Sequence, residues 1–243
     1  MGDRNSGEPG VYSHLSFFNR LAVVAVVALV CYGVYYTIGK DNRRESVERA
    51  RSLHNLHQIA YAMHQYHAEF GSLPPAVIFD QDREPLHSWR ILLLPSMSYH
   101  VLYAGCNLNE PWSSARNTKW LDTWTVPQYQ VPKDSAGGNA RIVAVTGDGS
   151  AFPYDHCTSF EDFSDGLNNV VILAIVKLPQ SKWYAPVDLL IEDLNALRVS
   201  ILAVAFADVH VHWLRENLTA DALRAACTIA GGERTEVSEL VAY

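Results

Sequence analysis

The hydrophobic pattern of the chain begins with an uncharged run of eighteen residues, Leu21 to Ile38, between Arg20 and Lys40. An apolar helix needs about 20 residues to cross a hydrocarbon core of about 30 Å. Together with Gly39 the run reaches this length, so it predicts a transmembrane helix over residues 21–39. Residues 1–20 then form a short tail, and residues 40–243 form one domain on one side of the bilayer.

Three other interpretations of the run fit the sequence less well. A cleavable signal peptide has an apolar stretch of about 7 to 15 residues and small residues at the cut site, whereas this run is longer and ends in tyrosines, Thr37 and Ile38. A lipoprotein signal needs a small residue before its cysteine, but Val30 precedes Cys31. A buried helix of a globular core rarely lacks polar residues over five turns. A retained anchor is favoured, with Tyr32, Tyr35 and Tyr36 as an interfacial aromatic belt.

A second apolar pattern follows at helical spacing and predicts an amphipathic helix from about Arg43 to Phe70. Gly71 ends this helix, and Pro74 and Pro75 then prevent its resumption. Only four residues separate the two helical patterns, so they form one long helix or a helix bent at Gly39. The apolar stripe consists of Leu53, Leu56, Ala60, Met63 and Phe70, with Ile59 and Tyr66 beside it.

The middle of the chain, Ala76 to Pro132, is rich in tryptophan and proline and has few clean periods. Short helical segments are expected at Ile91 to Leu94, Tyr99 to Ala104 and Ala115 to Leu121, separated by polar loops.

From Ala140 onward the pattern changes to strands. Ile142 to Thr146 and Val170 to Val176 are apolar runs next to turn residues, which is typical of buried strands. Ser200 to Phe206 and Val209 to Leu214 predict a hairpin around Ala207-Asp208, and Thr219 is the expected cap of a helix over Ala220 to Ala230. The predicted fold class is α+β, with the long N-terminal helix covering one face of an antiparallel sheet.

Charge and cysteine usage narrow the possible partners. The net charge is -7 with acidic residues spread along the chain, so no nucleic-acid partner is indicated. The cysteines, Cys31, Cys106, Cys157 and Cys227, match no zinc or redox spacing. A disulfide between Cys106 and Cys157 and buried free thiols both remain open.

Two residue groups invite a chemical interpretation. His54, His57, His64 and His67 share the amphipathic helix, and imidazoles at such spacing can share a zinc or copper ion. No acidic residue accompanies them, so a polar flank of the helix is the favoured interpretation, with partner contacts as another. Arg90, Glu110, Asp122 and Asp134 are favoured as salt bridges or loop caps over a catalytic pair. No catalytic, cofactor-binding or metal-ligating residue is therefore assigned, no cofactor is expected, and an enzyme is not predicted.

Several segments together resemble a planctomycete family catalogued as domain of unknown function 1559, whose members are similar to type IV pilins and pseudopilins. The resemblance runs from about Ser52 to Glu233. It rests on Asn55-Leu56-His57-Gln58-Ile59, His64-Gln65-Tyr66-His67, Gly71-Ser72-Leu73-Pro74-Pro75, Ser88-Trp89-Arg90, Leu94-Pro95, Asn109-Glu110-Pro111-Trp112, Asp165-Gly166, Trp183 with Pro186-Val187-Asp188-Leu189, and Ala205-Phe206-Ala207-Asp208.

The chain also departs from the pattern of this family. The prepilin cleavage signal and the glutamate inside the apolar helix are missing, because Ser16-Phe17-Phe18-Asn19-Arg20 precedes an apolar run without Glu. Ile175 stands where the family usually has a glutamate. Val209 replaces a glycine after the aspartate of the last hairpin, so a turn that needs positive φ is expected to be strained or reshaped.

The resemblance implies a pilin-like or pseudopilin-like structural or interaction protein, with a ligand- or metal-binding module outside the cytoplasm as the alternative. The expected partners are the bilayer, through Leu21 to Ile38, and another copy or a cell-envelope protein. The expected location is the inner membrane. More positive charges follow the apolar run than precede it, and a simple count of these charges predicts that the domain lies in the cytoplasm. The resemblance implies the periplasm instead.

Overall fold

The computed structural model describes residues 12–132, 141–179, 181–197, 200–232 and 237–242, and the side chains of residues 12–25 and 237 lie outside that description. The chain divides into two compact units, Met1–Val47 and Glu48–Tyr243. The first helix, α1, spans Tyr12–Phe70 and contributes to both units.

Helix α1 joins the two predicted helical segments without a break, so Gly39 does not interrupt it. In the second unit its apolar stripe is fully buried at Leu56, Ile59 and Met63. The helix ends as predicted at Gly71, which has φ 77° and donates its N–H to the carbonyl of His67 at 2.7 Å.

The predicted membrane span, Leu21 to Ile38, is not confirmed by the described residues. Its first part, residues 21–25, has no described side chains. Where side chains are described, no helix combines the length and the apolar character that crossing a membrane requires.

The main sheet has the strand order β5-β3-β4-β6-β7. The predicted strands are confirmed as β3 (Arg141–Thr146), β4 (Val171–Val176), β6 (Ile201–Phe206) and β7 (Val211–Trp213), and each neighbouring pair of these is antiparallel. The short strand β5 (Leu189–Leu190) pairs in parallel with β3 instead. The predicted α+β fold with an antiparallel sheet is therefore confirmed for these four strands, and β5 makes the sheet mixed. Strand β5 was not predicted, because a two-residue edge strand is too short to leave a pattern.

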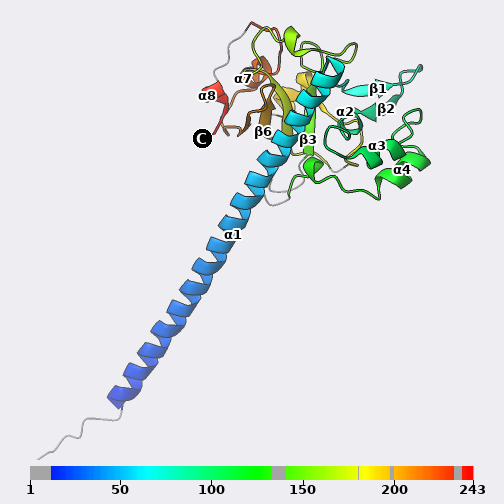
Figure 1. Ribbon diagram of the computed structural model, residues 1–243. Coiled ribbons are helices and arrows are strands. Elements are labelled where there is room, and N and C mark those ends of the chain that lie inside the picture. The colour runs from blue at the N-terminus through cyan, green and yellow to red at the C-terminus, as the bar shows by residue number, and fades with distance from the viewer. Residues whose placement is uncertain (1–11, 133–140, 180, 198–199, 233–236, 243) are drawn as a thin grey trace, which may run out of the picture. The chain divides into compact units, whose positions relative to one another are not determined.

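Successive residues of the central strands enter two separate cores. Ile142 of β3 belongs to the same cluster as Leu56 of α1, whereas its neighbour Val143 belongs to the cluster that contains Leu223 of α7 (Ala220–Ala225). In Figure 1 the cyan part of α1 lies over β3 and β6. Both faces of the sheet are covered, which explains why its strands are continuous apolar runs.

The remaining elements surround this sheet. The hairpin of β1 (Val77–Phe79) and β2 (Pro85–Ser88) gathers with α2 (Trp89–Leu92), α3 (His100–Gly105) and α4 (Ala115–Leu121) on one side of it (Figure 1). The three helices confirm the short helical segments expected from the sequence, while the hairpin was not predicted. The other elements are η1 (Pro127–Tyr129), η2 (Phe160–Asp162), η3 (Ile191–Asp193), α6 (Leu194–Leu197) and α8 (Val237–Leu240).

The helix predicted near the C-terminus begins at the expected residue but is shorter than predicted. Thr219 caps α7 as expected, because its hydroxyl accepts from the N–H of Ala222. The helix ends at Ala225 and not at Ala230, since the carbonyl of Ala226 accepts from the N–H of Val171 at 2.6 Å and draws the chain against β4.

The turn of the last hairpin keeps the backbone conformation that a glycine would favour. Val209 has φ 70°, and the N–H of His210 binds Oδ1 of Asp208 at 3.2 Å. A β-branched residue is strained in the left-handed region. The expectation that Val209 strains this turn is confirmed.

Candidate functional site

A buried ion pair joins two of the segments that carry the family resemblance. Arg90 of α2 and Asp188, next to β5, lie 3.0 Å apart between Nη2 and Oδ1, with side chains 2% and 3% exposed. The same Oδ1 atom accepts from Nε1 of Trp89 at 3.1 Å and from the N–H of Ala144 at 2.9 Å. Asp188 therefore ties α2 to strand β3 through three donors.

The guanidinium of Arg90 also binds the backbone around it. Nη2 donates to the carbonyl of Ile142 at 2.8 Å, and weaker contacts reach the carbonyls of Ala185 and Val187 at 3.4 and 3.3 Å. The guanidinium lies 4.3 Å from the centre of the Trp89 ring, which adds a cation–π contact. These contacts make Arg90 a structural centre of the domain.

Beside this ion pair lies a cavity of about 610 Å³. It belongs to the second unit and is bounded by the part of α1 after Val47, by η1 and the loop that follows it, by the start of β3 and by the segment before β5. The lining residues are Glu48, Arg51, Asn55, Arg90, Pro127, Tyr129, Gln130, Val131, Pro132, Arg141, Ile142, Ser181, Lys182 and Trp183.

One wall of the cavity is fixed by α1 and by stacked rings. The amide of Asn55, buried in α1, donates to the carbonyls of Pro127 and Gln130 at 2.9 and 3.0 Å. The ring of Trp183 stacks on buried Tyr129, with 5.6 Å between the centroids and 13° between the planes. Tyr129 donates its hydroxyl to the carbonyl of Arg90 at 2.8 Å, so the rings are anchored to the ion-pair network.

The cations of the cavity differ in how they are paired. Lys182 binds both carboxylate oxygens of Asp122, at 2.8 and 2.7 Å, and these hydrogen bonds hold the pKa of that carboxyl below its usual range. Neither the Arg51 nor the Arg141 guanidinium has a hydrogen bond or an ion pair within the part of the chain that is described. Burial lowers the pKa of Arg141 to about 10, the charge of Arg90 adds to this effect, and Asp188 opposes it.

The histidines of α1 do not converge. Nε2 of His64 lies 2.6 Å from the carbonyl of Ala207, and Nε2 of His67 accepts from the N–H of Phe160 at 3.2 Å. Both imidazoles pack on the Phe160 ring at 4.3 Å, whereas His54 and His57 are exposed.

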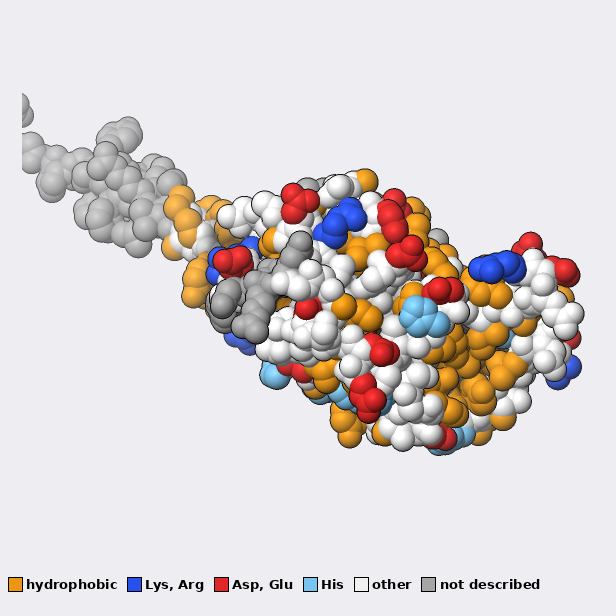
Figure 2. Space-filling model, turned by 90° about the horizontal axis from the view of Figure 1, so that it is seen from above, with side chains coloured by type: hydrophobic (Ala, Val, Ile, Leu, Met, Phe, Trp, Pro, Cys, Tyr) orange, Lys and Arg blue, Asp and Glu red, His pale blue; other side chains and the backbone are white. Residues whose placement is uncertain are grey.

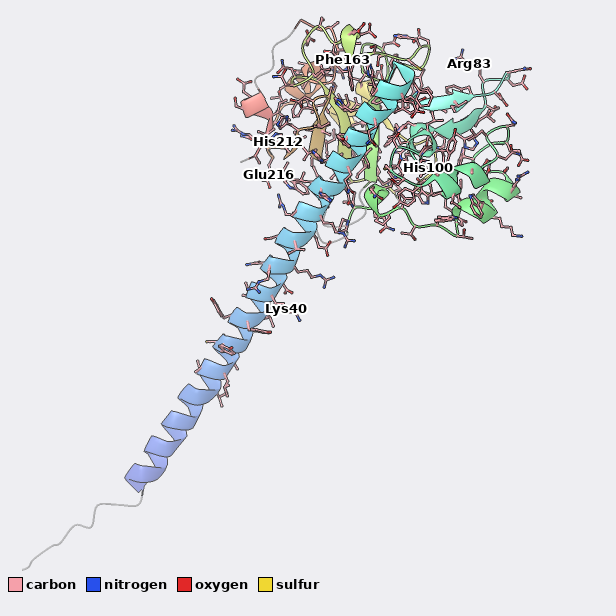
Figure 3. The ribbon with its side chains drawn as sticks, viewed as in Figure 1. Lys40, Arg83, His100, Phe163, His212 and Glu216 are labelled. Atoms are coloured by element: carbon pink, nitrogen blue, oxygen red, sulfur yellow. The ribbon has the colours of Figure 1, made fainter. Side chains whose placement is uncertain are left out.

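The other histidines are also dispersed. Figure 3 places His212 and His100 on different sides of the domain. Among the described residues, no three His, Cys, Asp or Glu side chains form a group that could hold a metal ion.

The four polar residues considered as a catalytic group have separate contacts. Arg90 pairs with Asp188 and Asp122 with Lys182, while Glu110 accepts from the amide of Asn107 at 2.7 Å. Asp134 lies outside the described residues. Cys106 and Cys157 are not joined, because all four cysteines are free thiols, and burial raises the pKa of Cys106 to about 11.

Sequence reasoning did not identify the partner of Arg90 or the cavity. Arg90 and Asp188 lie 98 residues apart, and the cavity is lined by five separate segments, one of which is Arg90 itself. The usable signal was the presence of both residues in the segments Ser88-Trp89-Arg90 and Pro186-Val187-Asp188-Leu189, which carry the resemblance.

Comparison with known proteins identifies a family and no closer relative. Neither a curated protein nor a solved structure matches the chain. A family model described as protein of unknown function (DUF1559) matches residues 42–173, which is more than half of the chain. The matched range contains the part of α1 that enters the core, the Arg90 segment, β3 and the first half of β4. The chain therefore belongs to the DUF1559 family of proteins of unknown function.

Proposed function

We propose that this protein is a pilin-like structural or interaction protein that is held at a bilayer by the first half of α1. The supporting observation is the exposure of large apolar side chains along this helix. Nine of them, from Val26 to Ile38, are between 51% and 78% exposed. Figure 2 shows orange side chains at the start of the described part of α1. Exposed apolar surface of this extent indicates an apolar partner, and a lipid bilayer is the partner that suits an uncharged helical run.

The domain after Val47 offers the second part of the proposed function. Its sheet is covered on both faces, so contacts with another protein fall to the loops and to the edge strands β5 and β7. Its proposed role is to present these surfaces close to the membrane, toward another copy or a cell-envelope protein. The proposed location is the inner membrane, with the domain in the periplasm.

Charged residues in the middle of the apolar run test the attachment. The double substitution Val27→Arg and Val30→Arg places two charges at residues that are 55% and 59% exposed. Each arginine at the centre of a span costs about 2.5 to 3.5 kcal/mol on insertion scales. We expect the unchanged protein to stay with the membrane pellet after alkaline carbonate extraction and the double variant to move to the supernatant.

The matched control is Val47→Arg, which introduces the same charge on the same helix beyond the run. Val47 is 60% exposed, so the change alters no packing and should leave the protein in the pellet. Equal extraction of the unchanged protein and the double variant would contradict the proposed anchor.

The side of the membrane is tested with the thiol of Cys157, which is exposed in the domain, whereas Cys227 is fully buried. A periplasmic domain predicts that a membrane-impermeant maleimide labels the protein in intact cells and that Cys157→Ser removes most of the label. Labelling that appears only after the inner membrane is broken would place the domain in the cytoplasm instead.

A further inference from the structure

The cavity beside the Arg90–Asp188 pair has the features of a binding site for a small organic anion. We propose that it binds a compound with a carboxylate or phosphate group, which contacts Arg51 and Arg141, and with an apolar body, which lies against Trp183. This inference goes beyond the proposed function, because it concerns only the second unit and does not depend on membrane attachment.

The balance of charges in the lining favours an anion. Arg90 is neutralised by Asp188 at 3.0 Å and Lys182 by Asp122 at 2.7 Å, so neither supplies an unpaired charge. Of the four cations in the lining, this leaves the guanidiniums of Arg51 and Arg141, which have no ion pair among the described residues. Glu48 is the only carboxylate among the lining residues named above, and its Oε2 atom is buried without a hydrogen-bond partner. The unpaired charges of the described lining therefore sum to one positive charge.

The type of cation narrows the ligand further. A guanidinium is planar and presents paired N–H donors that match the two oxygens of a carboxylate or phosphate. Arg51 comes from α1 and Arg141 from the first residue of β3, so the two approach from separate elements. Arg141 is half-buried and its guanidinium has no hydrogen bond or ion pair among the described residues, although the charge of Asp188 acts on it from a distance. An oxyanion would supply the missing acceptors.

The rest of the lining suits an apolar body. Pro127, Val131, Pro132 and Ile142 line the cavity together with the Trp183 ring. The stacking of Trp183 on Tyr129 and the hydrogen bonds of Asn55 to the η1 loop hold this wall before any ligand arrives. A volume of about 610 Å³ accommodates a small organic molecule, and such sites combine apolar walls with a few polar groups in this way.

Phenyl phosphate is a suitable probe, because it has both an oxyanion and an aromatic body. Isothermal titration calorimetry of the detergent-solubilised full chain should show one binding site for it. Inorganic phosphate lacks the aromatic ring that would lie against Trp183, and phenol lacks the oxyanion that would bind the arginines. Each should therefore bind at least about tenfold more weakly than phenyl phosphate.

Two variants locate the site. Arg51→Gln and Arg141→Gln should each weaken phenyl phosphate binding by about tenfold or more, because each removes charge-assisted hydrogen bonds. Arg51 is exposed on α1, so its replacement leaves the core intact even if Arg141→Gln disturbs β3. The control Arg116→Gln removes the same charge from an exposed position of α4 outside the cavity and should leave the affinity unchanged.

Two results would overturn the proposal. One is binding of phenyl phosphate that is no tighter than binding of phenol. The other is an equal loss of affinity in Arg51→Gln and Arg116→Gln, which would indicate a nonspecific effect of net charge. Neither result bears on the carbonate extraction, so failure of this site is distinguishable from failure of the proposed anchor.

Discussion

Replacing Asp188 with asparagine is expected to lower the free energy of unfolding by about 3 to 5 kcal/mol, the usual effect of removing one partner of a buried ion pair. The substitution keeps the size of the side chain and an oxygen that accepts from Trp89 and Ala144. It removes the charge that balances Arg90, whose guanidinium is only 2% exposed. Urea unfolding of the full chain in mild detergent, followed by tryptophan fluorescence, measures the change.

The matched control is the same substitution at an exposed ion pair. Asp122 and Lys182 are 44% and 54% exposed, so Asp122→Asn should cost less than about 1 kcal/mol. If the two variants unfold at the same urea concentration, the Arg90–Asp188 pair contributes no more than a surface contact. The double variant Arg90→Met with Asp188→Asn should lose less stability than Asp188→Asn alone, because it leaves no buried charge without its partner and keeps an acceptor for Trp89 and Ala144.

The sequence predicted those parts of the fold in which burial imposes a local pattern. The cores on both faces of the sheet make β3, β4 and β6 continuous apolar runs, and all three were predicted within one or two residues. The end of α1 was predicted for a related reason, since Gly71 supplies the positive φ that the helix terminus needs.

The missing elements depend on contacts between distant residues. Strand β5 consists of two residues that pair with Val145 and Thr146 of β3, and a segment this short has no period. The β1–β2 hairpin has only three and four residues, none of them fully buried on β1. Such elements form because the rest of the fold holds them in place, and a local pattern cannot reveal that.

The candidate site was beyond sequence reasoning for the same reason. The sequence favoured a salt bridge or loop cap for Arg90, and the acidic residues considered with it were Glu110, Asp122 and Asp134. Its actual partner, Asp188, follows 98 residues later and is brought to α2 by the pairing of β5 with β3. That Arg51 and Arg141 have no hydrogen bond or ion pair with any residue the structure describes likewise appears only once the surrounding chain is folded.

Helix α1 shows a different limit of prediction from sequence, because the two halves of one continuous helix lie in different environments. Leu29 is 70% exposed in the first unit, whereas Leu56 is completely buried against the sheet in the second. Helical periodicity predicts an apolar face in either case, but it does not say whether protein or lipid covers that face.

The same substitution at these two leucines separates the two environments. Leu56→Ala should lower the free energy of unfolding of the domain by about 2 to 5 kcal/mol, because it removes buried methyl groups and leaves a cavity. Leu29→Ala should change that free energy by less than about 0.5 kcal/mol, since its side chain has no core to lose. Urea unfolding in the same detergent, monitored by tryptophan fluorescence, compares the two; all six tryptophans follow residue 48 and report on the second unit.

The contrast between the two variants tests how α1 is divided. A large loss of stability in Leu29→Ala would mean that the first half of the helix packs against protein, which would remove the main support for a bilayer partner. A small loss in Leu56→Ala would mean that α1 contributes little to the core. The expected pattern, a large effect only at Leu56, follows from a helix whose second half belongs to the domain and whose first half has the proposed apolar partner outside it.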